Sequence, residues 1–330
     1  MQALQYTRPK NLRLTALPDP EPSTDQVLVE VIACGICGTD LHILAGEAFS
    51  ASPVVLGHEF TGKVLRAGSK VAELTPGTIV AIDPNNHCDH CEYCLRGDVH
   101  LCRNIRPAGI SYNGGWAELC VVPAIQVHPV PVHLDPRLAA LAEPLSCVIH
   151  GWDRIAPAGP DRSVLIMGAG LIGLLWALLL RMNGLIDLHI TEPQHNRRDA
   201  AHRLGFSCMS PGALASKFDI IIDCSGSPSA IEEAQDHLKP GGRLLLFGVA
   251  PDNARISISP YRIFQNEWTV MGSVINPFTF SRALTLLPAL GLGLADLGVV
   301  TFPLVEYEQA LKITRTGEAT KVMFDLRRGG

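Results

Sequence analysis

The sequence predicts an α/β protein of two domains, one a mostly antiparallel β-barrel and the other a doubly wound parallel sheet. Three observations predict this fold class. The chain has 330 residues, 47% of them hydrophobic, which is enough material for two cores. Its first 147 residues contain short β-like runs broken by Gly, Pro and Asn. From Ser163 onward, apolar strands alternate with helical segments, as they do in parallel sheets.

The expected strands and helices follow in chain order. The first domain contains the β-like runs QVLVEVIAC (26–34), FTGKVLRAG (60–68), TIVAID (78–83) and AELCVVP (117–123). In the second domain the strands are SVLIMG (163–168), DLHITE (187–192), FDIIIDCSG (218–226) and RLLLFGV (243–249). The helices between them are LIGLLWALLLRMNG (171–184), RRDAAHRLG (197–205) and AIEEAQDHL (230–238).

After Gly272 the alternation stops, and helices and edge strands are expected in the tail. We assign this tail back to the first domain. The predicted domains are therefore residues 1–147 with 277–330, and residues 148–276.

Charge and hydropathy exclude two classes of partner. The formal net charge is -5, with 27 basic and 32 acidic residues, so the chain has no excess of positive charge to neutralise a nucleic-acid backbone. Residues 164–180 are uncharged and approach the length of a membrane span, but their three glycines indicate a buried strand that turns into a buried helix. The first residues lack the apolar core of a secretory signal, so we expect a cytoplasmic protein.

A glycine-rich segment predicts a dinucleotide site. Gly168, Gly170 and Gly173 fit G-x-G-x-x-G between an apolar strand and a helix that begins near Leu171 and Ile172. Such glycines permit a tight turn and let backbone N–H groups approach a pyrophosphate at the helix N-terminus. The alternative is a glycine-rich turn without a ligand.

The end of the next strand favours NAD over NADP. Glu192 lies 19 residues after Gly173 (192 − 173), where a carboxylate accepts hydrogen bonds from the adenosine ribose and repels a 2′-phosphate. Arg197 and Arg198 lie just beyond it and are able to hold a phosphate or to cover the adenine. They could equally form a solvated helix face.

Four of the ten cysteines predict a structural zinc site. Cys88, Cys91, Cys94 and Cys102 give C-x2-C-x2-C-x7-C in a loop with few apolar residues, which matches a closed tetrahedral zinc site. An iron–sulfur cluster is the alternative, although bacterial cluster motifs end in C-P with a shorter last spacing. The nearby histidines are expected to face solvent; they are His87, His90 and His100.

Three further segments carry candidate catalytic residues: GICGTDLH (35–42), GHE (57–59) and LAEPLS (141–146). Each alone has an ordinary explanation, because a lone Cys is usually a small buried hydrophobe and a Glu before Pro commonly starts a helix. Together with the four-cysteine loop and GAGLIG, in this order, they resemble the medium-chain zinc alcohol dehydrogenase family. The resemblance covers essentially the whole chain and is strongest to the sorbitol and polyol dehydrogenase branch.

This resemblance implies a GroES-like catalytic domain, a Rossmann domain and a catalytic zinc. Cys37 and His58 would be zinc ligands, with Glu59 and Glu143 as the next candidates. Glu143 occupies the position of the third protein ligand, and Cys147 is a rival for it. Which of the two glutamates binds the metal directly stays open.

The implied activity is transfer of a hydride from a secondary alcohol to NAD, with polyols ranked first. By the same resemblance, Thr39 takes the hydroxyl proton and passes it through the nicotinamide ribose to His42, while Asp40 orients His58. The expected cofactor contacts are completed by Gly248, Val249 and Ser273. The family forms dimers or tetramers by pairing strand edges, for which ARISISPYRI (254–263) and WTVMGSV (268–274) are candidates.

The substrate pocket is expected to include Leu44, Phe49, Trp116 and residues 273–276. Sorbitol dehydrogenases as a family carry an arginine in the region that matches GSVIN, and this chain has none there. L-Threonine, 2,3-butanediol and simple secondary alcohols therefore remain alternatives to a polyol. A non-catalytic zinc- and NAD-binding protein is a further alternative, which the intact set of candidate catalytic residues opposes.

Overall fold

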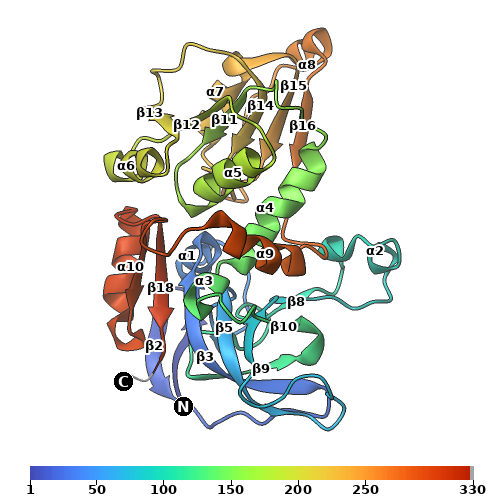
Figure 1. The fold of residues 1–330 in the computed structure, drawn as a ribbon, viewed down its shortest axis with the longest axis vertical. Helices are drawn as coiled ribbons and strands as arrows, with labels where there is room; N and C mark the ends of the chain where they lie inside the picture. The colour runs from blue at the N-terminus through green and yellow to red at the C-terminus, as the bar shows by residue number, and fades with distance from the viewer. Residues whose placement is uncertain (328–330) are drawn as a thin grey trace.

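A computed structural model describes residues 1–327 and confirms the two-part α/β fold. Figure 1 shows a parallel sheet at one end of the molecule and an antiparallel sheet at the other, with helix α4 (Ala142–Ile155) running between them. A small lobe that carries α2 (Glu92–Leu95) projects to one side. The boundary predicted between residues 147 and 148 lies inside α4.

The parallel sheet has six strands in the order β13-β12-β11-β14-β15-β16. Their bounds are β11 (Val164–Met167), β12 (Leu188–Thr191), β13 (Ser207–Met209), β14 (Phe218–Asp223), β15 (Leu238–Leu246) and β16 (Thr269–Gly272). The helices of this half are α5 (Leu171–Met182), α6 (His195–Arg203), α7 (Pro228–Ala234) and α8 (Pro260–Asn266). In chain order the strands are arranged 3-2-1-4-5-6, the arrangement that binds dinucleotides at the carboxyl ends of its strands.

The uncharged run at 164–180 forms the centre of this half. All four residues of β11 are buried, and α5 is apolar nearly all round because it packs on the sheet and against α4. Within residues 1–327, no helix combines the length and the apolar character needed to cross a membrane.

The antiparallel half is organised around β3 (Gln26–Ile36). Its seven-stranded sheet has the order β10-β6-β5-β3-β18-β17, and β9 also pairs with β3. The other strands of this sheet are β5 (Phe60–Ala67), β6 (Ile79–Ile82), β9 (Leu119–Pro123), β10 (Val127–Pro129), β17 (Val299–Phe302) and β18 (Lys321–Asp325). Strand β18 comes from the C-terminal tail and pairs antiparallel with the end of β3.

Smaller elements complete the fold. Two short sheets contain β1 (Gln2–Arg8), β2 (Asn11–Ala16) and β4 (Val54–Val55), and β7 (Asn85–Asn86) with β8 (Arg106–Pro107). The remaining helices are α1 (Gly38–Ala45), α3 (Pro136–Ala139), α9 (Phe280–Leu286) and α10 (Tyr307–Thr316). Helix α9 packs against α4, so the segment after β16 touches the element that lies between the two sheets.

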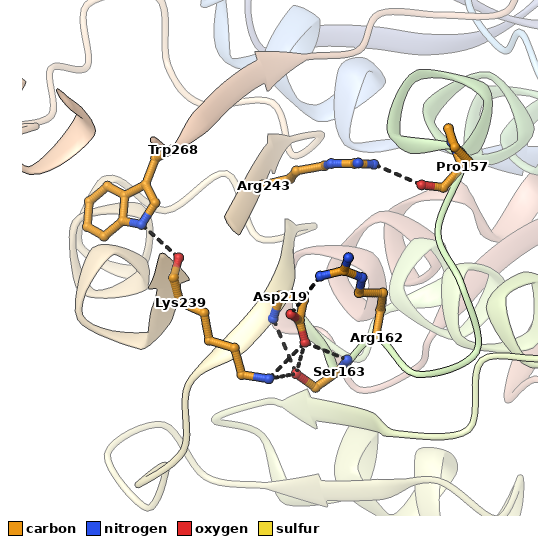
Figure 2. Close-up of polar contacts among 7 residues, drawn as sticks. All are labelled: Pro157, Arg162, Ser163, Asp219, Lys239, Arg243 and Trp268. Atoms are coloured by element: carbon orange, nitrogen blue, oxygen red, sulfur yellow. Dashed lines mark hydrogen bonds and ion pairs between the residues drawn. The ribbon is translucent and has the colours of Figure 1, made fainter. Parts of the chain in front are cut away.

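A polar network holds the amino ends of three parallel strands together (Figure 2). The Asp219 carboxylate accepts hydrogen bonds from the Ser163 backbone N–H (3.0 Å) and hydroxyl (2.7 Å), and from Lys239 Nζ (2.8 Å). Arg162 adds a contact of 3.2 Å, and the Trp268 indole donates to the Lys239 carbonyl at 2.9 Å. These residues lie at the amino ends of the strands, opposite the carboxyl ends where ligands bind in this kind of sheet. Their role is therefore to stabilise the fold.

We expect Asp219→Asn to weaken this network in a pH-dependent way. Burial raises the pKa of Asp219, but the Lys239 and Ser163 contacts outweigh it and hold the pKa well below its usual value. A depressed pKa adds stability above the unfolded-state pKa, and this stability is lost as the pH falls through the folded-state pKa. Urea denaturation should therefore show a loss of about 2 kcal/mol at pH 7 that shrinks below about pH 4.

Arg162→Gln is the matched control, because its half-exposed guanidinium contacts the same carboxylate and should contribute less than about 1 kcal/mol. An Asp219→Asn loss that is equal at pH 7 and pH 3 would contradict the assignment.

Candidate functional site

The glycine-rich turn joins β11 to α5 at the carboxyl edge of the parallel sheet. Gly168 has φ +111°, and a Cβ on Gly173 would lie 1.9 Å from the Gly168 carbonyl oxygen, so a side chain at Gly173 would clash with the loop backbone. Gly170 is the N-cap of α5. In the first helical turn the Leu171 N–H donates to the Thr320 carbonyl at 3.3 Å, and the next N–H groups have no acceptor within the helix, which suits a phosphate.

Glu192 braces this turn directly. Its side chain is 3% exposed, and its two carboxylate oxygens accept hydrogen bonds from the backbone N–H groups of Ala169 and Gln194, both at 2.9 Å. The two arginines differ in position. Arg197 lies 4.0 Å from the Glu192 carboxylate, whereas Arg198 donates to backbone carbonyls at 2.8 and 2.6 Å.

A cavity of about 240 Å³ is found here. Among its lining residues are Gly168, Gly170, Thr191, Glu192, Arg197 and Ser225. Leu171, Ile172 and Gly173 line an adjoining cavity of about 270 Å³ together with Arg197.

The projecting lobe brings the four cysteines of the loop together. Sulfur–sulfur distances are 4.0 Å from Cys88 to Cys94, 3.6 Å from Cys91 to Cys94 and 3.9 Å from Cys91 to Cys102. Zinc–sulfur bonds of about 2.3 Å in a tetrahedron require sulfurs about 3.8 Å apart. Backbone N–H groups, foremost that of His90, lower the pKa of the Cys88 thiol to about 6, which favours the thiolate that a metal needs. The four residues fit zinc.

The histidines of this lobe correct one expectation. His90 is exposed, as expected. His87 is half-buried and pairs with Asp89 at 2.8 Å, and His100 stacks edge-on against His150 with ring centroids 4.7 Å apart. The prediction that they all face solvent was wrong for His87 and His100, because the lobe folds back on neighbouring residues.

A second cluster joins Cys37, His58 and Glu59. Cys37 is the N-cap of α1, and His58 and Glu59 come just before β5, the strand next to β3. One ligand atom of each lies within 4.8 Å of the others, and His58 and Glu59 are buried. Asp40 faces His58 Nδ1 at 3.5 Å and accepts a hydrogen bond from the Cys37 backbone N–H at 2.8 Å. A sulfur, a nitrogen and a carboxylate oxygen in this proximity fit a catalytic zinc.

Glu143 lies beside this cluster, in the first turn of α4. It is buried, and Cys147 Sγ contacts its carboxylate at 3.6 Å. Burial, the nearby Glu59 charge and the opposing effect of His58 leave the pKa of Glu143 raised to about 7. The structure places Glu59 within the three-residue cluster and Glu143 along its margin.

A cavity of about 500 Å³ opens onto the cluster. It brings residues of both halves together: Cys37, Thr39, His42, His58, Glu59, Asn85, Glu143, Cys147, Ile172, Gly248, Val249, Ser273, Val274 and Ile275 are among its lining residues. Leu44, Phe49 and Trp116 are not among them, so that part of the pocket prediction was wrong. Leu44 and Trp116 are buried in the antiparallel core, and Phe49 is 80% exposed.

The side chains expected to move a proton lie along one wall. The Thr39 hydroxyl is 3.8 Å from Cys37 Sγ, and His42 lies one turn later on α1. The His42 ring contacts the Glu47 carboxylate through Nδ1 at 2.7 Å. This contact fixes the ring and leaves Nε2 for exchange with solvent. Glu47 was missed from the sequence, because it follows the motif in a loop.

Lys321 is a second residue that sequence reasoning missed. It begins β18, and its Nζ pairs with Glu59 Oε2; the side chains are 8% and 2% exposed. A Cβ on Gly35 would lie 2.0 Å from the same Glu59 oxygen, so the glycine leaves the room that the pair occupies. No local pattern marks this lysine, because only the pairing of β18 with β3 brings it to the cluster.

Comparisons with known proteins identify relatives that are zinc-binding dehydrogenases, in agreement with the two candidate zinc sites. Residues 23–132 match the family described as alcohol dehydrogenase GroES-like domain, and residues 172–288 match the one described as zinc-binding dehydrogenase. The chain is 34% identical to D-altritol 5-dehydrogenase from Agrobacterium fabrum, over 93% of this chain and 94% of that protein. It is 33% identical to L-threonine 3-dehydrogenase from Saccharopolyspora erythraea, over 98% and 99%.

Among solved structures, a zinc-binding dehydrogenase from Sinorhizobium meliloti 1021, bound to NADP, superposes with a TM-score of 0.91. It is 35% identical to this chain, and the match covers 98% of each.

The buried Lys321–Glu59 pair predicts a large effect of charge removal. Lys321→Met leaves a buried carboxylate without its partner, which costs about 3–5 kcal/mol. We expect this loss in urea denaturation of protein freed of its catalytic zinc, so that no metal charge compensates Glu59. The double variant Lys321→Met/Glu59→Gln should recover most of the stability. Equal losses for the single and double variants would show that the charge pair does not matter.

Proposed function

Because this chain belongs to the zinc-dependent medium-chain alcohol dehydrogenases, in their polyol dehydrogenase-like branch, we propose that it oxidises a secondary hydroxyl of a polyol to a ketone with NAD as acceptor. One observation carries the proposal. A single cavity is lined by the Cys37–His58–Glu59 cluster from one half of the molecule and by Gly248, Val249 and Ser273 from the other. An alcohol held there would lie between a metal and a nicotinamide.

The residues divide the chemistry among themselves. Cys37 and His58, with Glu59 or Glu143, would hold the catalytic zinc, and the four thiolates of the lobe would hold the structural one. When bound, zinc supplies a Lewis acid that makes a hydroxyl more acidic, and the nicotinamide supplies the hydride acceptor. Asp40 keeps the His58 ring in place from behind, as carboxylates do for zinc-ligating histidines.

The Thr39 hydroxyl is proposed to accept the substrate proton and to pass it toward His42. Thr39 lies beside Cys37, and His42 is 28% exposed at the cavity wall. An imidazole that reaches solvent can exchange protons with water near neutral pH. Glu47 holds the ring in the orientation that this exchange needs.

Oxidation of L-threonine is the second candidate, because several relatives carry that name, among them the Saccharopolyspora erythraea protein. The cavity favours a polyol instead. Within the described residues, no lysine or arginine lines it, so a substrate carboxylate away from the zinc site would have no permanently charged cationic side chain to pair with. The neutral hydroxyl groups of a polyol require only hydrogen-bond partners, and neutral polar side chains such as those of Asn85 and Ser273 line this cavity.

NAD is proposed as the cofactor on the position of Glu192. Its carboxylate is buried at the strand end and already polarised by two backbone N–H groups, so a 2′-phosphate beside it would meet a fixed negative charge. The NADP bound to the Sinorhizobium protein makes Arg197 the competing determinant.

We further propose that the chain forms a homodimer or homotetramer through the edge of the parallel sheet. Strand β16 lies at that edge, and Val270 on it and Val274 just after it are 36% and 50% exposed. An uncovered apolar strand edge favours pairing with a second copy.

The first test is NADH formation by the zinc-loaded protein across polyols, 2,3-butanediol, L-threonine and simple secondary alcohols. We expect a polyol to give the highest kcat/KM. Thr39→Val should keep the zinc content and lower turnover by about 100-fold or more, since a positioned proton acceptor contributes about 10²–10⁴-fold. Near-normal turnover of Thr39→Val would contradict the proposed proton path. If L-threonine gave the highest kcat/KM, the substrate would be assigned as L-threonine and not as a polyol.

Cofactor choice is tested with Glu192→Gln, which removes the charge and keeps an acceptor for one of the two backbone N–H groups. Wild-type protein should prefer NAD, and the variant should lose at least about tenfold of that preference in the ratio of kcat/KM for NAD over NADP. Arg197→Gln is the matched control, which lowers the use of NADP. A wild-type preference for NADP that Arg197→Gln abolishes would reverse the assignment.

A further inference from the structure

The wall of the catalytic cavity contains an amide side chain, that of Asn85, to which the proposed chemistry assigns no role. Asn85, in β7, lies between the antiparallel sheet and the projecting lobe. Of the other polar groups outside the cluster and the proton path, Ser225 donates to Asp223 at 2.6 Å, and Ser273 is a proposed cofactor contact. A polyol carries several hydroxyls besides the one that reacts, and they need partners in this cavity.

The orientation of the Asn85 amide is set by two neighbours, the partly buried Asp83 and the buried Asn276. Its Nδ2 donates to Asn276 Oδ1 and lies 3.5 Å from Asp83 Oδ1, and its backbone N–H donates to the same Asp83 oxygen at 3.1 Å. Asn276 Nδ2 donates to the other Asp83 oxygen at 3.2 Å. An ionised carboxylate only accepts hydrogen bonds, so the NH₂ side of the amide must face Asp83. Side-chain Oδ1 of Asn85 is then left free of these contacts.

Asp83 is suited to orient the Asn85 amide as a hydrogen-bond acceptor. Burial raises its pKa to about 6, and the contacts from Asn85 and Asn276 oppose that rise, so the group remains mainly ionised at pH 7. Asn276 is 3% exposed and belongs to the segment that follows β16, so it comes from the other half of the molecule. The amide is therefore held from both halves, and little side-chain entropy remains to be lost on binding.

Two cavities meet at this residue. Asp83 and Asn276 line a second cavity of about 500 Å³, whereas Asn85 and Ile275 line both this one and the catalytic cavity. The Nδ2 atom of Asn85 contacts Asp83 and Asn276, which line the second cavity. Its free oxygen is the group available to the catalytic one.

We propose that Asn85 is a specificity-determining residue whose Oδ1 accepts a hydrogen bond from a hydroxyl on a substrate carbon beyond the one that reacts. The inference rests on the proposed function and deepens it. The class of substrate is a neutral polyol with at least one further hydroxyl near the reacting carbon. Asp83 and Asn276 are positioning residues, because they act only by holding the amide.

The test compares a polyol with butan-2-ol, which has the reacting hydroxyl alone. Asn85→Ala should lower kcat/KM for the polyol by about 10- to 100-fold, mainly through KM, because the lost contact is remote from the reacting carbon. The kcat/KM for butan-2-ol should change by less than about threefold. Asn85→Leu keeps the volume without the amide and should give the same result if Asn85→Ala folds poorly.

Asn86→Ala is the matched control, because Asn86 neighbours Asn85 on β7 and lines only the second cavity; it should leave both substrates unchanged. Asn276→Ala should give a smaller loss that is again selective for the polyol. Equal losses for polyol and butan-2-ol, or an unchanged ratio, overturn the role of Asn85 while the dehydrogenase assignment stands. A wild-type protein that oxidises butan-2-ol but no polyol overturns the inference and the polyol proposal together, and one that oxidises no alcohol overturns the proposed function itself.

Discussion

The pairing of β3 with its neighbours fixes the positions of Cys37, His58, Glu59 and Lys321 around the proposed zinc site. The end of β3 leads into Cys37, and its antiparallel partner β5 brings His58 and Glu59 alongside through the pair Cys34↔Phe60. On the other side, β18 pairs Val322 with Ile36 and so delivers Lys321 to the same place. A shift of one residue in either register would turn these side chains to the opposite face of the sheet.

Buried charge is the second constraint on the site. Glu59, Lys321 and Asp40 all lie within the protein, where an unpaired charge is costly. The structure resolves this cost by pairing Lys321 with Glu59 and by placing Asp40 against His58 and a backbone N–H. The carboxylates therefore stay close to the metal position without depending on the metal alone for compensation.

The sequence was sufficient for the features whose residues lie close together in the chain. The dinucleotide turn and the four cysteines are marked by local spacing, and the alternation of strands and helices predicted the parallel sheet. Cys37, Thr39 and His42 lie in one contiguous segment, whose resemblance to the family implied their roles. Residues assembled by tertiary structure were not predictable in this way: Lys321, Glu47 and the contacts of Asn85 have no local signature. Trp116 was misassigned to the pocket because an apolar residue that lines a cavity looks the same in sequence as one that fills a core.

In the projecting lobe, a segment whose fold is set by metal ligands needs few packed side chains. Helix α2 within it has no buried residue, so the side chains between Cys91 and Cys94 carry almost no packing, whereas Val99 between Cys94 and Cys102 is buried. The shape of this helical turn depends mainly on the flanking sulfur atoms and on backbone contacts. Substitutions between Cys91 and Cys94 should therefore accumulate freely during evolution, and relatives are expected to differ widely there while the sheets beneath remain alike.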